Sequence, residues 1–284
     1  MNDIKQSRRH FVGSSIFGLL AVSLPNVVYA KSIFQKEWES ENKDLFYRYP
    51  AIHDDLVSEV VGKSHFDLER VKALVDKRPE LSRATWDWAF GDWESAIGAA
   101  SHVGRRDIVS YLLSKGAKAN IFTFAMLGAY DTVKSMIDFH PGLQKNYGPH
   151  GISLLEHAEV GLRMKDKITK EQIKNSEKLI DYLKGLGNAD GETFLEFKDD
   201  KEKYLGDYKY GDGEKDGFSI RLNMRKNLAL GRLGNTGGGL YMVKDNVFKY
   251  NKFPSVVVSF QFKNEQVVSL TVKEPGLTLV AKKM

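Results

Sequence analysis

The sequence predicts an α+β chain of several domains, in which an N-terminal α-solenoid of stacked helix pairs is followed by a small antiparallel β-barrel or sandwich. Helical patterns fill the first part of the chain, and short alternating segments bounded by turn residues fill the part after Tyr204, with the change near Gly191. The expected boundaries are a signal peptide over 1–30, a domain of about four helix-pair repeats over 31–191 and an antiparallel β-domain over 197–284.

The first thirty residues predict export. A basic start is followed by an uncharged and mostly apolar stretch from Phe11 to Ala30, which ends where a signal peptidase would cleave. The paired Arg8 and Arg9 stand before Phe11 in a segment that resembles the twin-arginine signal, with Val12 where that signal has Leu: Ser-Arg-Arg-His-Phe-Val. This resemblance implies a periplasmic or otherwise extracytoplasmic bacterial protein. The alternative is an anchor that stays uncleaved, since twenty residues suffice to span a membrane.

Composition excludes several classes of site and partner. The chain contains no cysteine, which excludes disulfides, thiolate metal sites and a cysteine nucleophile. The 42 basic and 37 acidic residues are interleaved, so the net charge of +5 gives no case for binding nucleic acid.

The clearest helix pair lies between Asp92 and Asn120. Small residues at Ala96, Ala99 and Ala100 allow close helix packing, Gly104 permits a reversal of the backbone, and a following helix carries an apolar stripe that stops at a second glycine. The stretch from Ala99 to Asn120 resembles the ankyrin repeat, although the preceding Glu94–Gly98 lacks the Pro and His of its Thr-Pro-Leu-His turn. Weaker copies on both sides imply an array of about four ankyrin-like repeats. The alternative is a helical domain without repeats, because the spacing between the copies is not constant.

Seven short segments after Tyr204 have the composition of β-strands. They cover 204–210, 218–224, 228–230, 239–243, 247–250, 255–262 and 267–272. The opening Tyr-Leu-Gly-Asp-Tyr and the closing Val-x-Ser-Leu-Thr-Val resemble the small β-domain appended to many serine β-lactamase-like hydrolases. No catalytic residue of those hydrolases belongs to that appendage.

The sequence contains no recognisable catalytic set, cofactor motif or metal motif. The histidines are scattered, and no two of them have helical spacing with an accompanying carboxylate, so we expect no metal and no cofactor. The loop that begins at Asp212 lacks the Glu of a calcium loop, and the glycine-rich loop at 234–239 lacks the Lys and the helix of a phosphate loop. We therefore expect that the chain is not an enzyme.

An aromatic loop before the best repeat is the predicted contact surface. Trp86, Trp88 and Phe90 are expected to bind a partner, and Trp93 is expected to be core. The alternative is that two of the rings in this loop cap the groove between the first and second repeats as core. Tyr147 and His150 occupy the corresponding place before the last repeat. These residues predict an exported, non-catalytic scaffold that binds another protein through the concave face of the array.

The alternative is an enzyme or enzyme accessory with a small-ligand site in the C-terminal β-domain. After cleavage of the signal peptide no membrane contact is expected.

Overall fold

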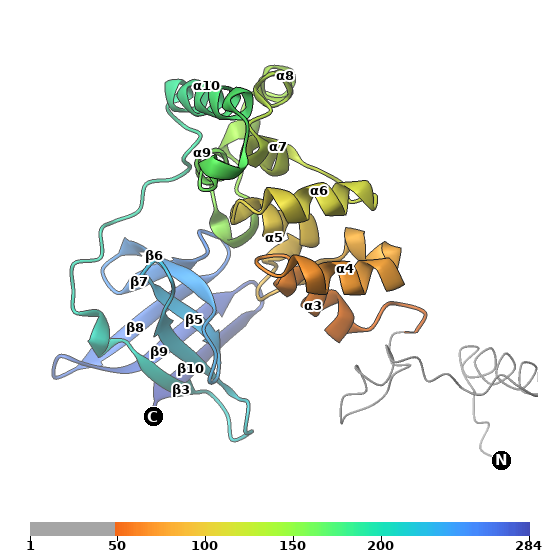
Figure 1. The fold of residues 1–284 in the computed structure, drawn as a ribbon. Helices are drawn as coiled ribbons and strands as arrows, with labels where there is room; N and C mark the ends of the chain where they lie inside the picture. Colours follow the sequence, from red (N-terminus) through yellow and green to blue (C-terminus); the bar gives the residue numbers. More distant parts are fainter. Residues whose placement is uncertain (1–48) are drawn as a thin grey trace, which may run out of the picture. The chain divides into compact units, whose positions relative to one another are not determined.

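The computed structural model describes residues 49–284, and Leu56–Met284 form one compact unit (Figure 1). The predicted signal residues Arg8, Arg9, Phe11 and Ala30 lie outside the described residues. Eight α-helices come first in the described chain: α3 Asp54–Lys63, α4 Leu68–Lys77, α5 Ala96–His102, α6 Arg106–Ser114, α7 Ile121–Leu127, α8 Tyr130–Phe139, α9 Leu154–Val160 and α10 Lys170–Leu186. A two-stranded antiparallel hairpin, β1 Thr85–Asp87 and β2 Trp93–Ser95, separates α4 from α5. Short 3-10 helices at Pro79–Arg83, Leu143–Lys145, Pro149–Gly151, Lys165–Lys167 and Lys201–Lys203 complete the helical elements.

Polar side chains cap the helices and so fix where each one begins. Ser95 caps α5 and Asn120 caps α7, each by accepting a hydrogen bond from a backbone N–H in the first turn. Ser153 and Thr169 form reciprocal capping boxes at the starts of α9 and α10. Between α5 and α6 the chain reverses at Gly104, whose φ of 81° is in the left-handed region that favours glycine.

The C-terminal part is a closed antiparallel β-barrel of eight strands. The strands are β3 Gly206–Lys209, β4 Gly217–Leu222, β5 Leu228–Arg232, β6 Gly238–Lys244, β7 Val247–Tyr250, β8 Val257–Lys263, β9 Gln266–Glu274 and β10 Leu277–Lys283. Each strand pairs with the next along the chain, and β10 pairs with both β9 and β3, which closes the barrel (Figure 1). The core of the barrel is a cluster of buried apolar and aromatic side chains, among them Tyr204, Tyr208, Phe248, Tyr250 and Phe260.

The predicted fold class is wrong. The structure shows eight helices interrupted by 3-10 turns and a β-hairpin, and no ankyrin solenoid within residues 49–284. The match to the repeat consensus reflects one helix–turn–helix, α5 and α6, because small residues and a left-handed glycine set that geometry locally. The way in which successive helix pairs stack depends instead on long-range packing. Strand β2 also lies where the repeat would have its Thr-Pro-Leu-His turn.

The C-terminal prediction of seven strands in a barrel or sandwich is corrected to a closed barrel of eight. Strands β3 to β9 lie at the seven predicted segments, and the additional strand is β10. The domain boundaries at 31–191 and 197–284 stay predictions. Within the described residues no helix is both long enough and apolar enough to cross a membrane.

Candidate metal centre

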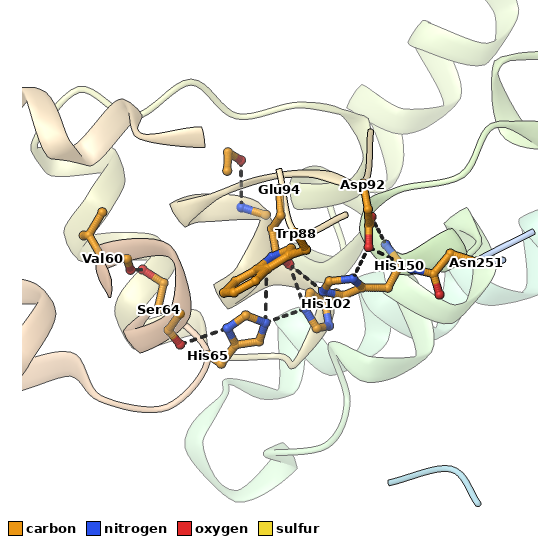
Figure 2. Close-up of polar contacts among 12 residues, drawn as sticks. Val60, Ser64, His65, Trp88, Asp92, Glu94, His102, His150 and Asn251 are labelled. Atoms are coloured by element: carbon orange, nitrogen blue, oxygen red, sulfur yellow. Dashed lines mark hydrogen bonds and ion pairs between the residues drawn. The ribbon is translucent and has the colours of Figure 1, made fainter. Parts of the chain in front are cut away.

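Three imidazoles and one carboxylate converge at a single point beside the hairpin (Figure 2). One potential ligand atom from each of His65, Glu94, His102 and His150 lies within 4.8 Å of all the others. His102 Nε2 is 2.9 Å from Glu94 Oε1 and 3.0 Å from His65 Nε2. His150 Nε2 is 3.4 Å from the same carboxylate oxygen.

Four separate segments deliver these side chains. His65 follows α3 in the turn that leads to α4, and His102 is the last residue of α5. Glu94 is the middle residue of β2, and His150 lies in the 3-10 turn Pro149–Gly151. The site is therefore a product of tertiary packing, and no pair of its members belongs to the same helix.

Glu94 has the contacts expected of a metal ligand without its metal. Its side chain is fully buried, and Oε2 accepts a hydrogen bond of 2.8 Å from the indole Nε1 of Trp88. Oε1 lies close to His102 and His150, yet the geometry of these contacts leaves it without a hydrogen-bond donor. An unpaired buried carboxylate oxygen is costly, whereas coordination of a cation satisfies it.

Outer hydrogen bonds orient two of the histidines. His65 Nδ1 lies 2.9 Å from the carbonyl oxygen of Gly62, and His150 Nδ1 lies 2.7 Å from Asp92 Oδ2. A donor proton on Nδ1 leaves the Nε2 lone pair free to point at the ion, and carboxylates and carbonyls are the usual partners of metal-bound histidines. Asp92 also accepts hydrogen bonds from the backbone N–H of His150 at 2.8 Å and from the amide of Asn251 at 2.8 Å.

The backbone around the centre is held in an uncommon conformation. His150 has a φ of 60°, and Phe90, Asn251 and Lys252 have φ values of 56°, 44° and 64°. Residues other than glycine pay an energetic cost in this region, and such residues concentrate at binding and catalytic sites. The Asn251 turn contacts the backbone at Gly151, next to His150, so the strained segments meet at the site.

When no metal is bound, the charges of the centre are those of two buried carboxylates, Glu94 and Asp92, and of the histidines that contact them. Burial acts to raise the pKa of Glu94, but contacts with His102 and His150 outweigh it and hold that pKa below its ordinary value. Burial opposes protonation of His150, yet its hydrogen bond to Asp92 and the nearby negative charge of Glu94 raise its pKa to about 10. Burial lowers the pKa of His102. One imidazolium therefore faces two carboxylates, a balance that favours a cation at the centre.

The residues present fit a divalent transition metal. Imidazole nitrogen and carboxylate oxygen together suit zinc, copper, nickel, iron and manganese ions, and three histidines exclude the all-oxygen environment that calcium and magnesium prefer. Metal–nitrogen bonds of about 2.0–2.1 Å require only small movements of atoms that already lie within 4.8 Å of one another.

The structure places the predicted partner-binding residues in and around this centre. Trp86 is half-buried in β1 directly opposite Glu94, and Trp88 donates to Glu94. Phe90 packs against the barrel core with its ring 4.9 Å from that of Tyr250. The hydroxyl of Tyr147 accepts a hydrogen bond from the backbone N–H of Glu192.

Of the predicted residues, His150 is a member of the centre. The partner-binding roles of all five stay predictions.

The expectation that Trp93 is core is wrong, because its side chain is 63% exposed. Successive side chains of a strand point to opposite faces. Since Glu94 points into the buried centre, its neighbour Trp93 must point outward.

The sequence pattern did not identify His65, Glu94, His102, Asp92 and Asn251 as site residues. One signal was available in the spacing of Asp92, just before the short strand β2, and Glu94, within it. Two acidic residues this close to an apolar segment require cationic partners if they are buried, and scattered histidines can provide them.

Comparisons with protein-family models, with curated proteins and with solved structures gave no match to this chain.

Proposed function

We propose that this protein binds a divalent transition-metal ion through Nε2 of His65, His102 and His150 and through Oε1 of Glu94. The single observation that carries the proposal is the buried Oε1, which has no hydrogen-bond donor although the imidazole nitrogens of His102 and His150 lie within 3.4 Å of it. An ion bound by all three groups explains why the two imidazole nitrogens lie so close to Glu94 Oε1 without donating a hydrogen bond to it.

The ligand set indicates which ions bind most tightly. Nitrogen-rich sites follow the general order in which copper binds more strongly than nickel, cobalt, iron or manganese, with zinc also strong. The absence of cysteine removes the thiolate ligands on which most closed structural zinc sites depend. The predicted roles as a protein-binding scaffold, or as an enzyme or its accessory, stay predictions beside this one.

The test is a metal titration of the full chain after chelation and removal of bound metal. Competition with a chromophoric chelator should show one tight site per chain for Zn²⁺ and Cu²⁺. His102→Ala and Glu94→Gln should each lose that site, since each removes one ligand of four. His140→Ala is the matched control, because His140 is exposed and lies outside the cluster.

Equal binding by His102→Ala, Glu94→Gln and the unmodified chain would overturn the proposal. So would a stripped chain that takes up neither ion. Circular dichroism of each variant establishes that a lost site is not a lost fold.

A further inference from the structure

The arrangement of the four ligands has consequences for what else the ion binds. Two donor atoms that each lie about 2.05 Å from one ion are about 2.9 Å apart at a right angle, about 3.3 Å apart in a tetrahedron and about 4.1 Å apart when opposite. The His102–Glu94 and His65–His102 separations are 2.9 and 3.0 Å, which are right-angled values, and the His150–Glu94 separation of 3.4 Å is close to the tetrahedral value. All six separations would be equal in a regular tetrahedron, whereas the full set here extends to 4.8 Å.

The ring positions identify which pair is opposite. The centre of a ligating imidazole lies about 3.2 Å from the ion, so two such rings are about 4.5 Å apart at a right angle, about 5.2 Å apart at a tetrahedral angle and about 6.4 Å apart when opposite. The rings of His65 and His150 are 6.4 Å apart, and they are inclined by only 24°. The ring of His102 is 4.8 Å from one and 5.1 Å from the other, and it is steeply inclined to both.

These separations describe a seesaw, with His65 and His150 on opposite sides of the ion and with His102 and Glu94 to one side of that axis. A seesaw is a trigonal bipyramid that lacks one ligand or an octahedron that lacks two. The vacant direction is opposite the two ligands that share a side, His102 and Glu94.

The exposed fractions of the four side chains indicate which side of the centre faces solvent. The side chains of His102 and Glu94 are the two most buried of the set, with exposed fractions of 10% and 0%. The two opposite ligands, His65 and His150, are 23% and 29% exposed. The buried ligands therefore lie toward the protein interior, and the vacant direction faces outward.

Resting on the metal-binding function proposed above, we infer that the centre keeps an open coordination position, which holds water and which a small anionic donor replaces. A divalent ion with three neutral imidazoles and one carboxylate carries a charge of +1, and Asp92, which contacts His150 and not the ion, leaves that charge on the ion to attract an anion. Centres with an open position are the kind at which substrates meet a metal directly, whereas structural centres are closed.

The test uses the full chain loaded with Co²⁺, whose visible spectrum reports coordination number, and azide as the anionic probe. The expected result is the weak absorption of five- or six-coordinate Co²⁺ and a saturable spectral change with azide. Loading with Cu²⁺ should give the axial electron paramagnetic resonance spectrum of a tetragonal centre. The control His140→Ala should respond in the same way.

Two outcomes overturn the inference, and they are distinguishable. Intense absorption of tetrahedral Co²⁺ that azide does not change would show a closed four-ligand centre, which removes the open position and leaves metal binding intact. Failure of the stripped chain to take up Co²⁺ at all would remove both the open position and the proposed function.

Discussion

The amide of Asn251 donates a hydrogen bond of 2.8 Å to Asp92 Oδ2, the same oxygen that lies 2.7 Å from His150 Nδ1. Asn251 follows strand β7 of the barrel, and its own Oδ1 accepts a hydrogen bond of 2.7 Å from the backbone N–H of Gly239 at the start of β6. A continuous path of hydrogen bonds therefore joins the barrel to a proposed metal ligand. Asp92 is the junction of this path, and both Asp92 and Asn251 are almost fully buried.

The Asp92–His150 contact predicts a loss of metal affinity in Asp92→Asn. The amide keeps the shape of the side chain but removes the negative charge that orients His150 and strengthens it as a ligand. Replacing an outer partner of this kind costs about 10- to 100-fold in metal affinity. Chelator competition with Zn²⁺ measures the loss, and unchanged affinity in a folded variant would show that Asp92 does not orient the ligand.

The Trp88–Glu94 hydrogen bond predicts a loss of stability in Trp88→Phe. Phenylalanine preserves most of the apolar contact but leaves Glu94 Oε2 buried without its donor, at a cost of about 1–3 kcal/mol. Chemical denaturation of the metal-free chain gives this free energy of unfolding. The matched control is Trp93→Phe, which should change stability little because Trp93 is 63% exposed. Equal effects of the two substitutions would contradict the role assigned to Trp88.

Local features of this fold were predictable from the sequence, whereas the closure of the β-barrel by an eighth strand was not. The helix pair α5–α6 follows from small residues and a glycine turn that act within about twenty positions. Strand β10 closes the barrel, yet Ala281 is its single buried residue and most of its other side chains are exposed. Its sequence therefore lacks the alternation of apolar and polar residues by which a half-buried strand is recognised. Its position is set by pairing with β3 and β9.

The candidate site was missed for a related reason. Spacing rules detect ligands that share a helix or a short loop, such as a pair of histidines four positions apart. Here His65, Glu94 and His102 come from a turn, a strand and a helix end, and His150 comes from a fourth segment in an uncommon backbone conformation. Only the packing of these segments brings the four groups together, so the pattern of one segment alone does not reveal the centre.

The predicted signal peptide over 1–30 indicates export by the twin-arginine route, and this remains a prediction because residues 1–48 lie outside the described structure. A fusion of residues 1–40 to a folded reporter should leave the cytoplasm. Arg8→Lys combined with Arg9→Lys should abolish that export, because the signal is read by a receptor that requires the arginine pair. Cell fractionation measures the outcome, and continued export of the double variant by the same route would exclude this interpretation.

The buried imidazole of His157 predicts that the folded state weakens in mild acid. Its side chain is fully buried, its Nδ1 lies 2.8 Å from the carbonyl oxygen of Ser153 and its Nε2 has no hydrogen-bond partner. Burial lowers the pKa of His157 from 6.5 to about 4. Between these two values the unfolded chain binds a proton that the folded chain does not, so stability rises with pH across this window.

The contribution of His157 is therefore complete above pH 6.5 and is lost as the pH falls toward 4, by up to about 3 kcal/mol. His157→Asn retains a donor near the position of Nδ1 but does not titrate. The variant should be less stable at neutral pH, because it loses the ring that packs against Phe122, and its free energy of unfolding should depend less steeply on pH between 6.5 and 4. Urea denaturation at a series of pH values measures both slopes, and their difference reports the protonation of His157 together with its coupling to the charges of His102 and Glu94. Identical slopes would show that folding does not lower the pKa of His157.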